Sequence, residues 1–261
     1  MTALLEIRGG VKSYGAVRAL DGAELTVEPG EVVALLGDNG AGKSTLVKAI
    51  CGVHALDAGE IRLDGRAVTF DSPVQARRAG IETLHQDLGL FDNLSAVANF
   101  RIGRELCRPA RLGRLAILRE RAMEEDWTAQ LERLAVRRVG ARQEVGLMSG
   151  GQRQAIALLR AVAFASRLVL LDEPTAALGV RESAHVLDLV GRLPGQGVAV
   201  LLISHNLEHV AAVADRAVVL RQGRSVGEAV PTAGNHEALV SLIVGAGTTA
   251  VASPEEGAQC R

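Results

Sequence analysis

A glycine-rich stretch near the amino-terminal end of the chain has the composition of a phosphate-binding loop. Residues 37–45 fit the pattern G-x-x-x-x-G-K-[ST] and directly follow a short apolar run. In such a loop the backbone N–H groups turn inward toward phosphate oxygens, and the next helix adds its positive end. The candidate phosphate-binding residues are Gly37, Asp38, Asn39, Gly40, Ala41, Gly42, Lys43, Ser44 and Thr45.

Two side chains of this loop have the chemistry to act on a nucleoside triphosphate. We expect Lys43 to reach the β- and γ-phosphates and the Ser44 hydroxyl to hold Mg²⁺. Lysine is scarce, since only three of the 29 basic side chains are lysines, at positions 12, 43 and 48. A compact ammonium fits a phosphate cradle where a planar guanidinium does not. An ordinary glycine-rich turn does not account for this strand-then-helix context.

Two adjacent carboxylates end a second apolar run, at residues 168–171. In phosphate-loop enzymes an acid at such a strand end holds Mg²⁺, so Asp172 is the candidate metal ligand. Glu173 is then placed to take a proton from an attacking water as a general base. Alone, these carboxylates indicate only a strand that ends in a turn. Together with the phosphate loop they predict hydrolysis of a nucleoside triphosphate.

A third candidate anion-binding feature lies just before that run. Ser149 is followed three residues later by Gln152, which is the pattern of a capping box and predicts a helix over 152–166. Ser149, Gly150, Gly151 and Gln152 therefore form a helix start whose amides face a second side of the phosphates.

Buried strands are needed to hold these groups in one place. Runs 31–36, 168–171 and 198–203 are short and apolar, and each precedes a helical pattern. They predict an α/β fold whose parallel sheet is flanked by helices, after a strand-rich opening.

From about residue 88 to 160 the pattern changes to helical. Apolar residues recur there at three- and four-residue steps. These are Leu115, Leu118, Ala122, Met123, Trp127, Leu131 and Leu134. We expect a helical insertion at 88–160 within one domain spanning 1–244, and a flexible tail at 245–261, where Gly, Ala, Thr and Ser are abundant.

Composition excludes several classes of protein. The 29 basic and 30 acidic side chains show no basic excess, and six aromatic residues provide no stacking platform, so we expect no nucleic-acid partner. No uninterrupted apolar segment is long enough to cross a bilayer, and no secretory signal is evident. Three distant cysteines suit a reducing compartment. We therefore expect a soluble cytoplasmic protein.

The order and spacing of the three motifs resemble those of ATP-binding cassette (ABC) proteins, over about residues 4–228. The resemblance implies a phosphate-loop core with an antiparallel β subdomain at its amino-terminal end, the ligands ATP and Mg²⁺, and a homodimer that encloses the nucleotide. It also assigns roles to three more residues. Tyr14 would stack on adenine, Gln86 would sense Mg²⁺ and the water, and His205 would contact the γ-phosphate. Asp215 is in the segment that usually follows this histidine.

Two positions depart from the family pattern, Met148 in place of leucine and Gly179 in place of an aspartate that couples the two sites of a dimer. A glycine at 179 is similar to the branch that imports monosaccharides such as ribose, xylose or fructose, as is the segment 86–105. This implies a peripheral subunit at the cytoplasmic face of the inner membrane. Its partners would be transmembrane permease subunits, docked near the segment after Gln86, and a periplasmic sugar-binding protein.

Three alternatives remain open at this point. The chain could serve an importer of another small solute, or it could be an ABC ATPase that acts on DNA or ribosomes. The segment His205-Asn206-Leu207-Glu208-His209 also fits H-x-x-E-H, a zinc-peptidase spacing, although no third ligand is obvious.

Overall fold

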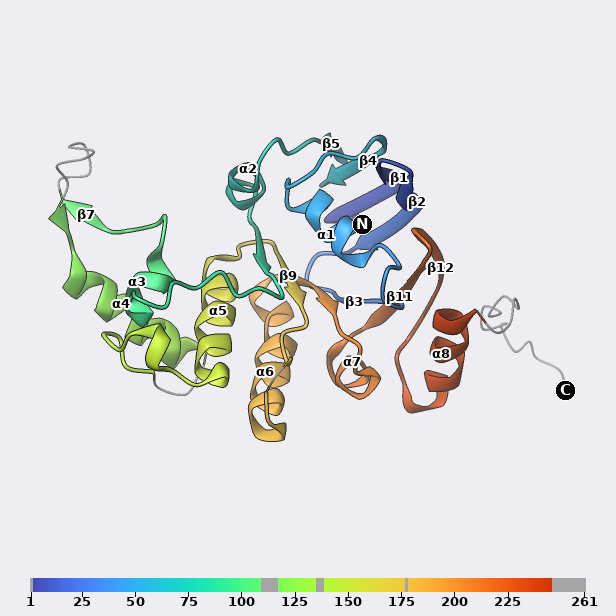
Figure 1. The fold of residues 1–261 in the computed structure, drawn as a ribbon. Coiled ribbons are helices and arrows are strands. Elements are labelled where there is room, and N and C mark those ends of the chain that lie inside the picture. The colour runs from blue at the N-terminus through green and yellow to red at the C-terminus, as the bar shows by residue number, and fades with distance from the viewer. Residues whose placement is uncertain (1, 109–116, 135–138, 177, 246–261) are drawn as a thin grey trace, which may run out of the picture.

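The computed structural model describes residues 2–108, 117–134, 139–176 and 178–245, and two sheets organise these residues (Figure 1). The larger sheet has six strands in the order β12-β11-β3-β10-β9-β6, with β12 as an antiparallel edge on otherwise parallel neighbours. Its strands are β3 (Val32–Leu36), β6 (Ile81–Leu84), β9 (Leu168–Asp172), β10 (Ala199–Ile203), β11 (Arg216–Arg221) and β12 (Arg224–Ala229). The predicted parallel core is confirmed, and β6, β11 and β12 extend it.

The central strands are buried on both faces, which explains their continuous apolar sequence. Successive side chains of β9 point to opposite faces, so Val169 and Leu171 join one hydrophobic cluster while Leu168 and Leu170 join another. On the first face the helices are α5 (Gly150–Phe164), α6 (Val180–Arg192) and α7 (Leu207–Val213). On the second face lie α1 (Lys43–Ile50), α2 (Pro73–Arg78) and the smaller sheet.

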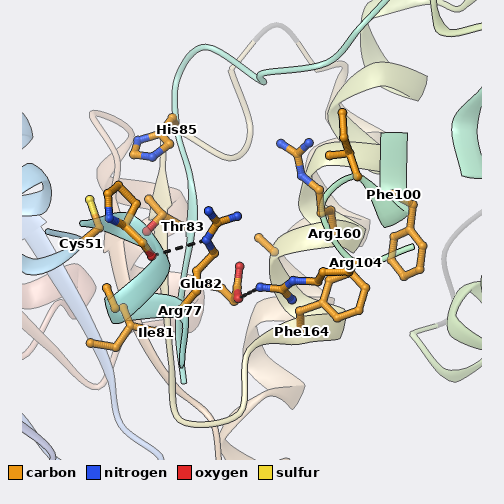
Figure 2. A pocket seen from close by; sticks show the side chains of 14 residues that line it. Cys51, Arg77, Ile81, Glu82, Thr83, His85, Phe100, Arg104, Arg160 and Phe164 are labelled. Carbon is orange, nitrogen blue, oxygen red and sulfur yellow. Dashed lines mark hydrogen bonds and ion pairs between the residues drawn. The ribbon is translucent and has the colours of Figure 1, made fainter. Parts of the chain in front are cut away.

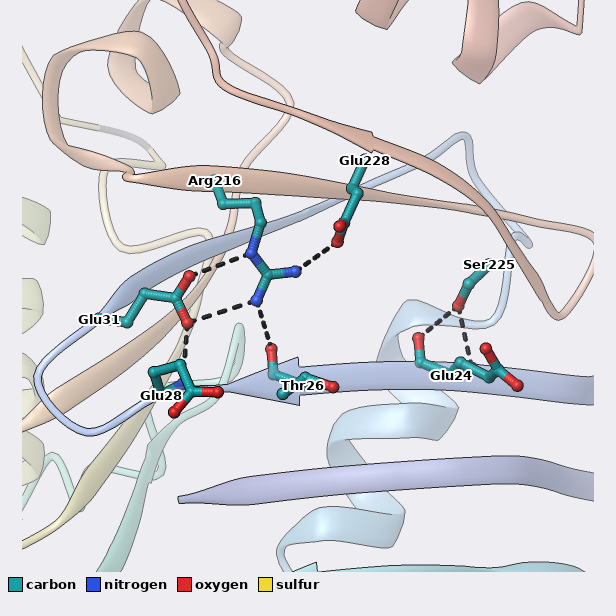
Figure 3. A network of polar contacts seen from close by, with 7 residues as sticks. All are labelled: Glu24, Thr26, Glu28, Glu31, Arg216, Ser225 and Glu228. Atoms are coloured by element: carbon teal, nitrogen blue, oxygen red, sulfur yellow. Dashed lines mark hydrogen bonds and ion pairs between the residues drawn. The ribbon is translucent and has the colours of Figure 1, made fainter. Parts of the chain in front are cut away.

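The smaller sheet is antiparallel, as the family resemblance implies, and its order is β2-β1-β4-β5. Its strands are β1 (Leu5–Tyr14), β2 (Val17–Val27), β4 (Ala58–Leu63) and β5 (Arg66–Val68). Polar contacts attach it to the edge of the larger sheet (Figure 3). The Arg216 guanidinium contacts Glu31 at 3.1 Å and Glu228 at 2.5 Å, and it donates to the Thr26 carbonyl at 2.8 Å. Since these three partners come from β2, β12 and the turn before β3, Arg216 helps fix the start of β3, which leads to the phosphate loop.

Between β6 and β9 the chain forms a helical insertion that shares the main hydrophobic core. Its elements are α3 (Ala96–Arg101), β7 (Cys107–Arg108), β8 (Ile117–Leu118), α4 (Glu120–Arg133), the 3-10 turn Val145–Leu147 and α5. Phe100 packs edge-on against Trp127 at 5.4 Å and stacks on Phe164 at 4.9 Å between ring centroids. The helical prediction is confirmed for Ala122, Met123, Trp127 and Leu131, which lie in α4, and Leu134 follows the end of that helix. It is wrong for Leu118, an exposed residue of β8. Leu115 lies outside the described residues.

The carboxyl-terminal end of the described chain packs against the β12 edge. After the 3-10 turns Pro194–Gln196 and Ala233–Asn235, the last helix is α8 (His236–Val244), with Leu239 buried against β11. Of the tail expected at 245–261, residues 246–261 lie outside the described residues, and Gly245 caps the end of α8. Among the helices described, none combines the length and apolar character needed to span a membrane.

Candidate functional site

Strand register brings the predicted site residues to one edge of the larger sheet. Ile203 of β10 pairs with Leu35 of β3 and with Asp172 of β9. Leu84 of β6 pairs with Leu171, one residue before Asp172. Because these strands are parallel, the segments that follow them leave the sheet at the same edge. The phosphate loop, Glu173, His205 and Gln86 therefore gather there.

Two glycines of the phosphate loop are required by close backbone approach. Gly37 has φ 147°, and a Cβ atom there would lie 2.2 Å from the Leu220 carbonyl oxygen. Gly42 has φ 105°, and a Cβ atom there would lie 2.5 Å from the Ala19 carbonyl oxygen. Gly40, by contrast, faces open space. The glycines thus press the loop against β2 and β11 on one side and leave its other side open.

Helix α1 begins at Lys43, within the predicted motif, so its first amides point into the loop. The first turn of an α-helix has N–H groups without intrahelical acceptors. Those of Lys43, Ser44 and Thr45 are in this position, and the Ser44 side chain is exposed beside them. Such an arrangement can bind an anion of phosphate size.

Lys43 is more deeply buried than its place in a surface loop predicted. Its side chain is 8% exposed, and Nζ donates to the carbonyl oxygens of Gly37 at 2.7 Å and Asp38 at 3.0 Å. Burial lowers the pKa of Lys43, while the negative charges of Glu173, Asp172 and Asp38 act against this shift. The ammonium therefore ties together the carbonyl groups at the start of its own loop.

The two carboxylates after β9 differ in setting. Burial raises the pKa of Asp172, opposed by the charges of His85, Lys43 and His205. Burial also raises the pKa of Glu173, opposed chiefly by His205. The Glu173 side chain is only 18% exposed, and its buried Oε1 has no hydrogen-bond partner among the described residues. His205 Nε2 lies 3.5 Å from that oxygen. Glu173 thus has a free acceptor atom and a raised proton affinity, as a general base requires.

Gln86 and Tyr14 are both exposed. Gln86 follows β6 by two residues, in a segment whose backbone is held by α5, because Arg160 donates to the carbonyls of Leu88 at 2.8 Å and Gly89 at 3.1 Å. Tyr14 ends β1, is 42% exposed and contacts His54 edge-on at 5.5 Å. The Lys12 ammonium lies over this ring, 5.9 Å from its centroid, so Tyr14 already has a cation next to its aromatic face.

The predicted capping box is confirmed at the start of α5. Ser149 Oγ accepts from the Gln152 amide at 3.3 Å, and Gln152 Oε1 accepts from the Ser149 amide at 3.0 Å. This helix start belongs to the helical insertion, and among the described residues its side-chain hydrogen bonds stay within the capping box, with none to the phosphate loop. The second candidate anion-binding face is therefore not hydrogen-bonded to the first within one chain.

Three buried or half-buried contacts around the base were not identified from sequence. Gln154 donates to the Pro174 carbonyl at 2.9 Å, and Thr175 Oγ1 lies 3.2 Å from His209 Nδ1. His85 has its pKa lowered by burial, with the Asp172 charge acting against this. No local pattern marks these residues, because each contact joins segments far apart in the sequence.

The structure argues against the zinc-peptidase alternative. His205 precedes α7, which begins at Leu207, so the two histidines of the motif do not share a helix face. His209 Nδ1 is already in contact with Thr175. Over the described ranges there is no group of three or more His, Cys, Asp or Glu side chains placed to hold a metal.

At Gly179, a Cβ atom would lie 2.6 Å from Glu182 Oε2, so an aspartate there requires Glu182 to move.

Known proteins resemble this chain in sequence along most of its length. The fructose import ATP-binding protein FrcA of Rhizobium meliloti is 48% identical over 223 residues, which cover 85% of this chain and 86% of that protein. The xylose/arabinose import ATP-binding protein XylG of Sulfolobus acidocaldarius is 46% identical, covering 87% and 88%. The ribose import ATP-binding protein RbsA 1 of Rubrobacter xylanophilus is 43% identical over 94% of this chain but only 48% of that protein, so the chain spans about half its length.

Solved structures agree in fold. A nucleotide-free ATP-binding cassette from an ABC transporter superposes with a TM-score of 0.79 at 24% identity, covering 94% of this chain and 98% of the other. A cassette in its ADP conformation gives 0.77 at 25% identity, covering 94% and 100%. The model of the ABC transporter family matches residues 20–176, more than half of the chain. The chain therefore belongs to the ABC transporter family, as an ATP-binding cassette with ATPase activity.

Proposed function

We propose that this chain binds Mg-ATP at the phosphate loop and hydrolyses it to drive import of a monosaccharide through separate permease subunits. The observation that carries the proposal is the convergence of Lys43, Asp172, Glu173 and His205 at one sheet edge, with a buried Glu173 oxygen left without a partner. The names of the similar proteins, which import fructose, xylose or arabinose, and ribose, support a monosaccharide as the solute.

Each residue of the edge has a distinct role in this proposal. The amides of residues 37–45 and the Lys43 ammonium bind the phosphates, and Tyr14 stacks on adenine. Glu173 accepts a proton from the attacking water, while His205 and Gln86 orient that water and the γ-phosphate.

Oxygen donors suited to Mg²⁺ are present at the same edge. Ser44, Asp172 and Gln86 offer a hydroxyl, a carboxylate and an amide oxygen, and hard oxygen ligands are the type that Mg²⁺ prefers. The raised pKa of Asp172 fits this role, because a buried carboxylate beside few cations gains most from a divalent ion. The ion would neutralise charge that develops on the phosphates.

A second copy of the chain completes the site. A capped helix start is formed by Ser149, Gly150, Gly151 and Gln152, and among the described residues it has no hydrogen bond to the phosphate loop of the same chain. We infer that this face binds the nucleotide held by a partner, so that hydrolysis requires two chains. The ADP- and phosphate-bound cassette that resembles this fold was solved as a dimer, at 23% identity and a TM-score of 0.73.

The cleft between the larger sheet and the helical insertion is the docking site that we propose for the permease. It encloses about 260 Å³ beside the Gln86 segment (Figure 2). Its wall carries Arg77, Arg104 and Arg160 against one acid, Glu82, which is paired with Arg104. This excess of positive charge favours a permease segment with acidic side chains. Docking there would hold the chain at the cytoplasmic face of the inner membrane, with a periplasmic sugar-binding protein on the opposite side.

Reconstitution tests the proposed function directly. The purified chain would be combined with a permease and binding protein encoded beside its gene, in vesicles, and phosphate release from Mg-ATP would be measured with fructose, ribose, xylose or arabinose. We expect one monosaccharide to stimulate hydrolysis. The same sugar should accumulate on the side of the vesicle membrane opposite the binding protein. Hydrolysis without solute uptake, or uptake only of a different class of solute, would contradict the import proposal.

Two adjacent arginines provide a matched test of the docking cleft. Arg77 lines the cleft, whereas its exposed neighbour Arg78 does not. Arg77→Glu should weaken copurification with the permease, and Arg78→Glu should not. Equal effects of the two variants would show that the cleft is not the docking site.

A further inference from the structure

The loop that carries Glu173 has a strained backbone that its surroundings must hold in place. Glu173 has φ 53°, in the left-handed region that non-glycine residues seldom adopt. Its amide donates to the Ile203 carbonyl, and its own carbonyl accepts from the Ala176 amide, each at 3.0 Å. A strained backbone conformation of this kind persists only where neighbouring contacts hold it in place. Residues with such conformations cluster at functional sites.

Helix α5 holds the loop from one side through Gln154. This side chain is 7% exposed, and its Nε2 donates to the Pro174 carbonyl at 2.9 Å. Gln154 lies one and a half turns beyond Ser149, on the same helix that begins with the capping box. A shift of that helix start is therefore passed to the residue next to Glu173.

Helix α7 holds the loop from the other side through His209. Its Nδ1 lies 3.2 Å from Thr175 Oγ1. The Asn206 side chain accepts from the amides of Glu208 and His209, so the cap beside His205 fixes the first turn that carries His209. The segment that carries His205 and the loop that carries Glu173 are thus joined by the side-chain contact between His209 and Thr175.

We propose that Gln154 and His209 are positioning residues that clamp the Glu173 loop between the Ser149 helix and the His205 segment. The inference rests on the proposed function of Glu173 as the base. These contacts would couple Glu173 to the Ser149 helix start, which binds the nucleotide of a partner chain. This coupling does not involve residue 179. Gly179 supplies no side chain for the coupling, whereas Gln154 and His209 contact Pro174 and Thr175 of the loop directly.

Isosteric substitutions test the clamp. Gln154→Met and Thr175→Val keep volume but remove the hydrogen-bonding groups, and His209→Phe keeps a ring. Each should lower kcat for Mg-ATP by about tenfold to a hundredfold, as expected when a reacting group is displaced by about 1 Å, while KM changes less than about twofold. Thr175→Ser, which retains the hydroxyl, should restore kcat.

The contact between Thr175 and His209 can be tested as a pair. If the two act through one hydrogen bond, the double variant Thr175→Val/His209→Phe should be no slower than either single variant. Matched controls come from α4, where Thr128 Oγ1 donates to the Glu124 carbonyl and Gln130 Nε2 donates to Asp126. Thr128→Val and Gln130→Met should leave kcat unchanged.

Several results would overturn the clamp. These are wild-type kcat in Gln154→Met and Thr175→Val, additive losses in the double variant, or a loss of thermal stability alone. Should Gln154→Met fail to fold, the kcat values of the single and double variants of Thr175 and His209 test the clamp instead. Glu173→Gln separates the two proposals: if it still hydrolyses ATP, the role of the base fails, and if it does not while the clamp variants remain fast, only the clamp fails.

Discussion

Replacing Glu173 by glutamine should stop hydrolysis and stabilise the nucleotide-free protein at the same time. The substitution preserves shape and removes only the charge, so the loop and its contacts are retained. Loss of a general base reduces kcat by about 10²–10⁴-fold. An ATP-bound dimer should then accumulate, because nucleotide and Mg²⁺ still bind but hydrolysis no longer releases the two chains.

The stability gain follows from the setting of the carboxylate. Burial raises the pKa of Glu173, and Oε1 has His205 Nε2 at 3.5 Å but no hydrogen-bond partner in the described part of the chain. The native state therefore holds the Glu173 proton more tightly than the unfolded chain, and the free energy of unfolding falls as pH rises above the ordinary carboxyl range. At neutral and alkaline pH an uncharged glutamine removes this penalty. We expect about 1 kcal/mol, a typical gain at a relieved functional site, or about 2–4 °C in Tm.

Three measurements check this prediction: steady-state phosphate release, thermal unfolding without nucleotide from pH 4 to 9, and light scattering after size exclusion with Mg-ATP. The Tm difference should vanish at acidic pH, where Glu173 is protonated in both states. Glu237→Gln, an exposed carboxyl in the first turn of α8, serves as the control. Turnover above about one-tenth of wild type would refute the base assignment. A Tm at or below wild type across the pH range would refute the burial argument.

The remaining predictions concern the binding groups. Lys43→Ala should abolish hydrolysis and weaken nucleotide binding. It should also lower the free energy of unfolding by about 1 kcal/mol, because the loss of two hydrogen bonds to carbonyl groups outweighs the relief of a buried charge; wild-type turnover would defeat the assignment. Tyr14→Ala should lose about 1–3 kcal/mol of ATP affinity, measured by titration, while Tyr14→Phe loses little; unchanged affinity with reduced stability would indicate a merely structural tyrosine. Ser149→Arg alone should be inactive, whereas mixing it with Lys43→Ala chains should restore some turnover, since one composite site of the mixed dimer is undamaged. Normal hydrolysis by Ser149→Arg, or constant activity per chain on strong dilution, would contradict a shared site.

Local pattern was sufficient for the parts of the site that lie on one continuous segment. Glycines at 37 and 42, the strand before them and the helix at Lys43 are all adjacent in sequence, and the positive φ angles at those glycines belong to the loop itself. Their close approach to Leu220 and Ala19, by contrast, is a tertiary feature. The capping box at Ser149 is equally local, since both of its hydrogen bonds lie within four residues. The α/β class followed from three apolar runs, because a strand buried on both faces has no polar side to show.

Helical periodicity alone misplaced Leu118. Its spacing continues the pattern of α4, but it pairs with Cys107 in a short antiparallel ladder and is 49% exposed. Periodicity cannot distinguish a residue that extends a helix from one that only precedes it, since both satisfy the same step. What decides is a strand partner eleven residues away, which spacing does not record.

Only the tertiary structure decided how the segments meet around the base. The contacts of Gln154 and His209 join residues from different helices and loops. The burial of Lys43 also depends on segments far apart in the sequence, as does the environment of the Glu173 oxygen that has no partner among the described residues. Their burial and pKa shifts depend on the neighbours that folding brings within a few ångströms, and these neighbours lie 20 and 34 residues away for Gln154 and His209. The sequence determined which groups can do the chemistry, because identity and local spacing are properties of one segment. The fold determined their environment, because desolvation and hydrogen bonding depend on all the segments that surround them.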